Sequence, residues 1–355
     1  MWYKRSEQNL RVSIFFSAAT LSGAFGGLLA YGISRMDGVG GKPGWAWIFI
    51  IEGLITFVVA CAAPFMMADF PEDAKFLTPE EKARTIQRLA DDAGASGEAP
   101  YARAHIVSAF TDWRSYAYAL IYVGVAEPLY SLALFTPTII SELGKWTRAQ
   151  SNLLSTPPYF LAFFVTLASA LYSDRLLHRG YFNVFWMLVV VAGYAILLGV
   201  DPTEKPGVAY FALFLCVSGV APCISNTITW AGGNVGPVYK RATSMGMLFV
   251  LGNSGGICSS LVYFSYESPR FRTGHGVGMG FAAMACVLSL LLSWDLKREN
   301  RRRDARYGTT NSAITRQSVG HDKYEAQLRI WGLEGKTQAE IEALGDHHPG
   351  FRYLA

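Results

Sequence analysis

Long apolar runs alternate with shorter polar segments along almost the whole chain. Eight runs of 20 to 26 residues stand out, at 12–34, 45–68, 115–140, 151–172, 181–200, 208–231, 243–264 and 275–294. A helix needs about 20 residues to cross a hydrocarbon core about 30 Å thick. Unbroken apolar runs of this length do not fit strands or the helices of a soluble domain. The pattern therefore predicts an all-α polytopic membrane protein with eight visible spans.

The polar segments divide the chain into four predicted parts, namely two spans in 1–68, a cytoplasmic central loop in 69–113, six spans in 114–295 and a cytoplasmic tail in 296–355. In the loop, Thr78, Pro79 and Glu81 have the spacing of a capping box with proline at the first helical position. They predict a helix start at this point. In the tail, the stretch "TQAEIEALG" predicts one short helix.

Composition and charge agree with a membrane protein. Of the 355 residues, 51% are hydrophobic and 16% are charged, whereas charged residues make up about 25% of an average soluble domain. The net charge of +4 comes mostly from Lys and Arg beside the ends of the spans. Such positions attract anionic headgroups, so membrane lipids, and no nucleic acid, are the expected partners of these charges.

Lys and Arg are unevenly divided between the two sides of the predicted membrane. The segments on the side of both termini hold 18 of them, and the opposite loops hold 7. The positive-inside rule therefore places both termini in the cytoplasm. The polar start "MWYKRSEQNLR" leads directly into a full-length span, so no cleavable signal peptide is expected.

Cysteine usage predicts neither a disulfide framework nor a metal site. All five cysteines lie inside predicted spans, at Cys61, Cys216, Cys223, Cys258 and Cys286. None falls in an outer loop, and their spacing matches no metal-ligand pattern. Packing is the ordinary role of such buried thiols, and no cofactor is expected.

Glu127 is the most informative polar residue inside a span. It lies at the midpoint of 115–140, within "YVGVAEPLYSLALF". An ionised side chain at this depth costs at least about 2.5–3.5 kcal/mol, so an intramembrane acid usually faces a protein or water-filled interior. Pro128 follows and leaves the carbonyl of Gly124 without its helical donor. We expect Glu127 to carry a coupling proton; the alternative is a neutral, hydrogen-bonded structural acid.

Four other residues in the spans are candidate substrate contacts. Tyr130 shares the helical face of the acid, Asn226 and Trp230 lie in "APCISNTITWAGGNV", and Asn253 lies in "RATSMGMLFVLGNSGGICSS". Small and amide residues at helical spacing also serve close helix packing in membrane proteins. Both roles stay open for each of the four.

A competing enzymatic signal is the stretch "GNSG" at 252–255. It matches the GxSG pattern of intramembrane serine proteases, and His275 is available as a base. Ser254 lies mid-span, however, and His275 begins the next span at the outer side, so about 15 Å of depth separate them at 1.5 Å per residue. A base must reach hydrogen-bond distance of its nucleophile. We therefore expect no enzyme.

The chain resembles fungal permeases of the anion:cation symporter group, in the major facilitator superfamily, at "WYKRSEQNLR", "GWAWIFIIEGLIT", "LFTPTII", "TITWAGGNVGPVYKRATSMG" and "HPGFRYLA". That group includes nicotinate, allantoate, pantothenate and biotin carriers. The resemblance covers nearly the whole chain and is specific for the group, not for the substrate. It implies a plasma-membrane transporter that takes up a small organic anion together with protons.

The stretch "ALYSDRLLHRG" is similar to the superfamily's short cytoplasmic loop signature. Asp174, Arg175 and Arg179 carry that similarity. Leu177 stands where a glycine is usual, and the final arginine comes one place late. The resemblance implies a gating or charge-relay role for this loop.

The resemblance also implies an incomplete set of spans. The family normally has twelve, in two halves around a central cavity, and matching 69–113 to its central loop makes the first two spans here the fifth and sixth. We therefore expect four spans to be absent. No Lys or Arg lies within the predicted spans, so an anionic substrate would be neutralised by absent spans, helix N-termini or a proton on Glu127. A non-transporting nutrient sensor and an inactive remnant stay open as alternative functions.

Overall fold

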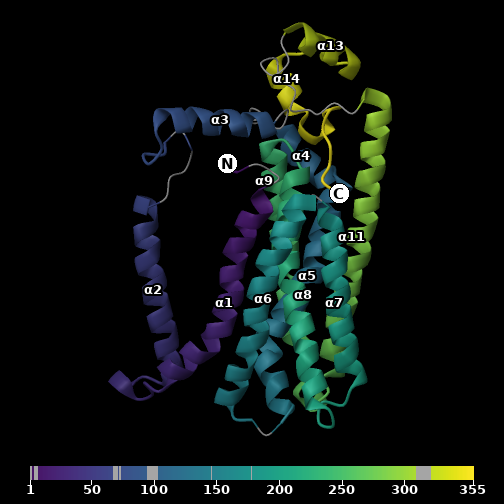
Figure 1. Cartoon of the computed structure of the whole chain (residues 1–355). Coiled ribbons are helices and arrows are strands. Elements are labelled where there is room, and N and C mark those ends of the chain that lie inside the picture. Colours follow the sequence, from purple (N-terminus) through teal and green to yellow (C-terminus); the bar gives the residue numbers. More distant parts are fainter. Residues whose placement is uncertain are drawn as a thin grey trace.

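In a computed structural model, the chain is a bundle of long helices (Figure 1). The structure describes residues 2–3, 7–66, 71, 73–93, 103–144, 146–176, 178–308 and 321–355, and within them it contains no β-strand. In that part of the chain, six helices are long and apolar enough to cross a membrane, namely α2 (Gly44–Met66), α5 (Trp113–Glu142), α6 (Arg148–Leu176), α7 (Arg179–Gly199), α8 (Pro206–Asn234) and α11 (Arg272–Tyr307). The predicted all-α membrane fold is confirmed.

Two further predicted spans have a different form. α1 (Gln8–Ser34) is a single helix of 27 residues that covers the predicted run 12–34. The run 243–264 instead forms two shorter helices, α9 (Val238–Asn253) and α10 (Gly255–Leu261), which meet at Ser254. The helix predicted there is interrupted at Ser254, whose N–H donates to the carbonyl of Leu251, three residues back, at 3.2 Å, while its backbone stays in the helical region (φ −61°, ψ −21°).

Both chain termini lie at the same end of the bundle, here called the terminal end (Figure 1). α1 runs from this end along α6 and α8, and η1 (Val39–Gly41) turns the chain at the opposite end towards α2. α3 (Pro79–Ala93) then crosses the terminal end and α4 (Arg103–Thr111) leads into α5.

Glycines allow the closest helix contacts in the core. A Cβ on Gly193 of α7 would lie 2.5 Å from Sγ of Cys216 on α8, and one on Gly124 of α5 would lie 2.7 Å from the carbonyl oxygen of Phe281 on α11. Small residues let backbones approach in membranes, where close packing rather than water exclusion holds helices together. α5, α7, α8 and α11 therefore form one tightly packed unit.

α2 stands apart from the other helices (Figure 1). Its large apolar side chains are exposed along the whole helix, including Phe49, Leu54, Phe57, Val58 and Phe65. A contiguous surface of this kind is stable against lipid or other helices rather than water. It supports a membrane environment for this part of the chain.

The predicted helix start in the central loop is confirmed. The backbone N–H of Thr78 donates to Oε2 of Glu81 at 2.9 Å, and the N–H of Glu81 donates back to Oγ1 of Thr78 at 3.4 Å. α3 accordingly begins at Pro79. The predicted short tail helix is α14 (Gln338–Ala343), whereas α13 (His321–Trp331) was not predicted.

The last eleven residues, 345–355, fold back onto the terminal end, and we call them the tail strap. They begin with η4 (Gly345–His347) and continue without regular structure. Leu354 exchanges two 2.7 Å hydrogen bonds with the side chain of Asn234 at the end of α8. Nζ of Lys240 on α9 lies 2.8 Å from Asp346 and 2.7 Å from Asp112. The strap thereby joins the ends of several helices.

Candidate functional site

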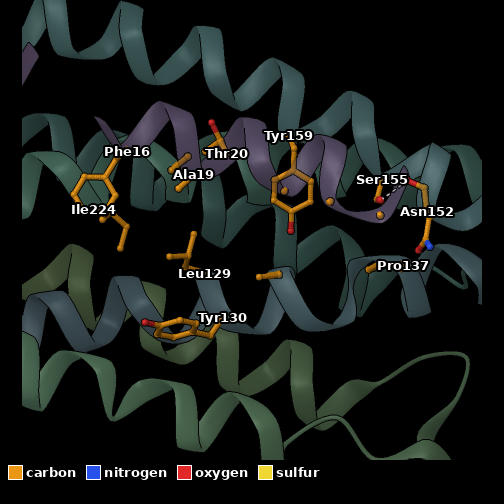
Figure 2. Close-up of a pocket in the computed structure, with 15 residues that line it drawn as sticks. Phe16, Ala19, Thr20, Leu129, Tyr130, Pro137, Asn152, Ser155, Tyr159 and Ile224 are labelled. Atoms are coloured by element: carbon orange, nitrogen blue, oxygen red, sulfur yellow. Dashed lines mark hydrogen bonds between the residues drawn. The ribbon is translucent and has the colours of Figure 1, made fainter. Parts of the chain in front are cut away.

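A cavity of about 410 Å³ lies between α1, α5, α6 and α8. Phe16 and Thr20 line it from α1, Leu129 and Tyr130 from α5, and Tyr159 from α6 (Figure 2). Figure 2 shows Tyr159 reaching from α6 towards α5 across this space. Its size suits a small organic molecule, and its mainly apolar wall with a few polar groups is typical of ligand sites.

The polar groups of the wall are hydroxyls and amides. Oη of Tyr130 donates to Oδ1 of Asn253 at 2.9 Å, at the edge where α9 meets α5. On the facing α6, the side-chain amide of Asn152 lines the cavity and has no hydrogen-bond partner in the described part of the chain. No charged side chain lines the cavity among the residues that the structure describes. The wall can therefore orient a polar ligand but supplies it with no counter-charge.

Direct contacts join α1 to the bundle on the terminal side of the cavity. Oγ of Ser13 donates to Oγ of Ser225 on α8 at 2.7 Å, with both side chains buried. The backbone N–H of Leu10 donates to Oδ2 of Asp174 on α6 at 2.9 Å. The α1 residues that line the cavity come later along the helix, towards the opposite end. These contacts hold α1 against α6 and α8 between the cavity and the terminal end.

Asp174, Arg175 and Arg179, the residues of the predicted loop signature, lie at the terminal end. Asp174 and Arg175 belong to the last turn of α6, and Arg179 is the first residue of α7, while Leu177 lies outside the described residues. The guanidinium of Arg179 is fully buried and donates to Oδ1 of Asp174 at 3.1 Å. Nη1 of the same guanidinium donates to Oγ1 of Thr229 on α8 at 2.6 Å. Arg175 is exposed.

This buried ion pair connects to α1 as well. Oγ1 of Thr229, which accepts from Arg179, lies 2.9 Å from Oδ1 of Asn9. A buried charge is stable only when it is paired and its remaining groups are hydrogen-bonded. Separating α1 from α6 and α8 would therefore disturb the surroundings of the ion pair.

Glu127 is fully buried, and it does not line the cavity. Oγ of Ser131 donates to its Oε1 at 2.7 Å, while its Oε2 is buried and has no hydrogen-bond partner among the described residues. Gly255 of α10 packs beside it, since a Cβ there would lie 3.2 Å from the backbone nitrogen of Glu127. The buried acid therefore lies at the interface between α5 and α10, with one of its two carboxyl oxygens hydrogen-bonded.

The break between α9 and α10 packs against α5, and its residues do not line the cavity. A Cβ on Gly252 would lie 1.9 Å from the ring of Tyr122, and one on Gly256 would lie 3.2 Å from the ring of Tyr130. Both glycines let the broken helix touch α5, and Asn253 between them accepts from Tyr130. Discontinuous helices near the membrane midplane are typical of transporter sites. The sequence signal that could have revealed the break is the run "GNSGG".

The structure places Asn226 and Trp230 outside the cavity lining. The amide of Asn226 donates to the carbonyl of Arg179 at 2.7 Å and to Oδ1 of Asn183 at 2.9 Å. Nε1 of Trp230 donates to the carbonyl of Leu354 in the tail strap at 2.7 Å. Of the four candidate contacts, Tyr130 lines the cavity and Asn253 does not, although Tyr130 donates to it. Asn226 and Trp230 bond to other parts of the chain instead.

Ser254 and His275, the pair weighed as a protease site, bond to other groups. Oγ of Ser254 donates to the carbonyl of Leu251 at 2.5 Å. Nδ1 of His275 lies 3.2 Å from the hydroxyl of Tyr263. The base is therefore engaged away from the hydroxyl that it would have to activate.

Comparison with known proteins assigns the chain to a family. The family model of the Major Facilitator Superfamily matches residues 1–260. The chain belongs to the major facilitator superfamily. With its apolar helices, this makes it an integral membrane protein.

Similar members of the superfamily are fungal transporters. An uncharacterized transporter of Schizosaccharomyces pombe is 33% identical over 91% of this chain and 64% of its own length. The MFS-type transporter cnsO of Penicillium expansum is 33% identical over 100% of this chain and 66% of its own. The high-affinity nicotinic acid transporter of Saccharomyces cerevisiae is 29% identical over 99% and 61%. The chain thus spans less than two thirds of the length of these relatives.

Proposed function

We propose that the chain forms the substrate-handling part of a secondary active transporter, which takes up a small organic anion together with protons across the plasma membrane. The observation that carries the proposal is the 410 Å³ cavity between α1 and the α5, α6 and α8 helices. Direct contacts of α1 close it at the terminal end, which the positive-inside rule assigns to the cytoplasm. The cavity then corresponds to an outward-facing state.

The two parts that move against each other would be residues 1–68, as the end of the first half, and 114–295, as the second half. The central loop 69–113 would connect them, and the tail 296–355 would remain cytoplasmic. Rocking of α1 away from α6 and α8 would separate Ser13 from Ser225 and Leu10 from Asp174, which now bond across that interface. Alternating access of this kind is typical of transporters built from repeats.

Glu127 would bind the coupling proton. An ionised carboxylate is costly at this depth, so binding and release of a proton would follow whether the surrounding helices admit water. Its interface with α10 is one place where such a change would occur, because the helix is interrupted at Ser254, beside the acid. Its Oε2 atom is available to a proton or a water molecule.

The cavity wall suits a small aromatic acid. Tyr130 and Tyr159 offer ring faces for stacking, and Asn152 offers an amide group for a carboxylate or a ring nitrogen. A proton that accompanies the anion removes the need for a cation in the described wall. Nicotinate is the first substrate to test, since one relative is named for its transport; a related vitamin or ureide is the alternative.

The test is uptake of radiolabelled nicotinate by yeast cells that lack their own nicotinate uptake and express this chain. We expect accumulation that rises with an inward proton gradient and collapses when a protonophore dissipates it. Unlabelled allantoate, pantothenate and biotin, added in excess, identify a different preferred substrate by competition. Binding without accumulation would support the nutrient sensor, and absence of both for every compound would contradict the proposal.

A further inference from the structure

A second cavity, of about 190 Å³, lies at the terminal end, outside the transport path. Glu299, Arg302, Arg303 and Arg306 line it from the extension of α11. The tail strap closes it from the other side with His347 and Pro349. Neither the cavity nor its arginines take part in the proposed transport.

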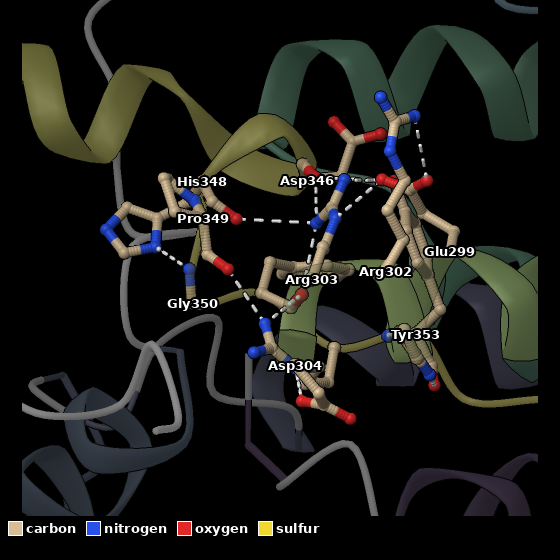
Figure 3. Close-up of polar contacts among 12 residues, drawn as sticks. Glu299, Arg302, Arg303, Asp304, Asp346, His348, Pro349, Gly350 and Tyr353 are labelled. Carbon is tan, nitrogen blue, oxygen red and sulfur yellow. Dashed lines mark hydrogen bonds and ion pairs between the residues drawn. The ribbon is translucent and has the colours of Figure 1, made fainter. Parts of the chain in front are cut away.

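The positive charge of this cavity is only partly balanced. Figure 3 shows Arg303 at the centre of a network, where it donates to Oε1 of Glu299 at 2.9 Å and to the carbonyls of Asp346 and Phe351 at 3.0 Å. The negative charge of Glu299 offsets the positive charge of Arg303. The guanidinium groups of Arg302 and Arg306 therefore give the cavity its excess positive charge.

Those two arginines have donors to spare. The Arg302 side chain is 75% exposed, and its nearest carboxylate oxygen, on Glu299, is 3.8 Å away. Arg306 lies over the ring of Tyr307, and no carboxylate pairs with it within the described ranges. Because they are four residues apart on one helix, both point along the same face. Like charges so placed repel each other unless an anion lies between them.

The position of the cavity along α11 places it near the membrane surface. Arg302 and Arg306 follow Trp294 by two to three helical turns, which is about 12–18 Å at 1.5 Å per residue. Trp294 is itself 61% exposed and is of the residue type that lies at the headgroup level. The arginines therefore lie at or just beyond the headgroup region, within reach of large headgroups and of solutes in the water.

We propose that this cavity is a binding site for a phosphate group, carried by a phosphoinositide headgroup or by a free inositol phosphate. Guanidinium groups match phosphate oxygens in bidentate geometry, and the imidazole of His347 adds one more donor. The site is formed by α11 on one side and by the strap on the other. A bound phosphate group therefore favours the docked strap over the released one by its differential affinity.

The test measures binding of two probes to the whole purified chain. Inositol 1,4,5-trisphosphate is titrated onto the chain in neutral detergent, and the chain is also placed in nanodiscs with phosphatidylinositol 4,5-bisphosphate or, as a charge control, phosphatidylserine. We expect Arg302→Gln with Arg306→Gln to weaken binding at least about tenfold, because two charge-assisted contacts are lost. Arg301→Gln is the control, because Arg301 is an exposed neighbour that does not line the cavity. It should change the affinity for the probe less than about twofold, as expected for a screened surface charge.

Strap docking provides a second readout, since trypsin reaches the bond after Arg352 only when the strap is released. Bound probe should slow this cleavage in the unmodified chain and have no effect in the double variant. Binding of the soluble probe identifies a free phosphate source, whereas binding in phosphoinositide nanodiscs alone identifies the lipid. Equal losses in the double variant and in Arg301→Gln, equal binding to phosphatidylserine, or no binding of either probe would overturn the proposal. Thermal unfolding of each variant shows that the fold is retained.

Discussion

Two buried residues, Glu127 and Gly252, make contacts that only the protein interior provides. Glu127 has one carboxyl oxygen bonded to Ser131 and the other without a partner among the described residues. Gly252 is in contact with Tyr122 so closely that any side chain would overlap it. Both residues lie in the densely packed protein interior, which has no free space to accommodate an added or removed atom.

At Glu127, replacement by glutamine keeps the shape and removes the titratable group. We expect Glu127→Gln to abolish accumulation driven by a proton gradient, because no coupling proton can bind. Exchange of labelled for unlabelled substrate at equal concentrations should persist, since it needs no net proton movement. The measurement is uptake with and without a pH gradient in vesicles that contain the expressed chain.

Glu52→Gln is the matched control, since Glu52 is exposed on α2 and does not line the cavity. It should leave both gradient-driven uptake and exchange unchanged. If Glu127→Gln behaves like this control, Glu127 is a structural acid and coupling resides elsewhere.

At Gly252, even a methyl group should be damaging. A Cβ would lie 1.9 Å from the Tyr122 ring, so Gly252→Ala forces α9 away from α5 and should lower the free energy of unfolding by about 1–3 kcal/mol. Gly246→Ala, on the same helix, is the control, because nothing lies within 4 Å of its Cβ position. The comparison is made by thermal unfolding in detergent; equal stability of the two variants would contradict the packing at the break.

At the scale of elements, the tail strap acts as a clamp on helix ends. Arg114 of α5 donates to the hydroxyl of Tyr353 at 2.9 Å, and Asn300 of α11 exchanges hydrogen bonds with the Tyr353 backbone at 2.8 and 2.9 Å. Lys240 of α9 is buried between Asp112 and Asp346. Releasing the strap would remove one partner from each cation and leave Lys240 with Asp112 and Arg114 with Asp295. Losing one partner of a buried charge is costly, which favours the docked form.

Acid should release the strap through His348. Burial first, and then the positive charges of Arg303 and Arg352, lower the pKa of His348 to about 4 from an ordinary value of about 6.5. The released strap therefore binds a proton more readily than the docked one. Docking is fully favoured above about pH 6.5 and weakens as the pH falls towards about 4. Tryptic cleavage after Arg352 should accelerate across this interval.

The control for this prediction separates the two neighbouring histidines. His348→Gln should flatten the pH dependence of cleavage between about 6.5 and 4, because the buried titratable group is gone. His347→Gln, at an exposed position in the same turn, should leave the profile unchanged. A profile that depends on His347 rather than His348 would contradict the role of the buried ring.

At the scale of the whole molecule, one interface decides which end of the cavity is closed. α1 contacts α6 and α8 through hydrogen bonds at the terminal end, and through Gly23 and Gly27, whose Cβ positions lie 3.2 Å from Tyr159 and Asn152, further along. Val12 and Phe16 of α1 also pack against the apolar core beside these polar contacts. The proposed transport cycle requires this interface to open at the terminal end.

Locking this interface should stop transport reversibly. Ser13→Cys with Ser225→Cys places two thiols where the hydroxyl oxygens are now 2.7 Å apart, within reach of a disulfide after small adjustments. We expect oxidation to abolish uptake and reduction to restore it, since the terminal end then cannot open. Each single cysteine variant controls for oxidation of the native thiols, and uninhibited uptake by the cross-linked pair would show that this interface does not open during transport.

Much of the fold could be predicted from local pattern, and the candidate site only in part. Long apolar runs predict spans because each must satisfy its own backbone in lipid, and Thr78 with Glu81 predicts a helix start from contacts only three residues apart. The break at Ser254 was missed, because glycines inside an apolar run serve packing and breaks alike. Asn226 and Tyr130 looked equivalent in sequence, but the partners of Asn226 are more than 40 residues away along the chain.

The sequence by itself determined that this chain enters a membrane as a set of helices, and which end carries most of the positive charge. Both depend on hydrophobic burial and local backbone bonding, which act residue by residue. Only the tertiary structure decided that Tyr130 lines a cavity and bonds to Asn253, that Glu127 lies beside a helix break, and that the tail covers the terminal end. These depend on which helices become neighbours, and the rotation of a helix about its axis by a few tens of degrees changes every such contact.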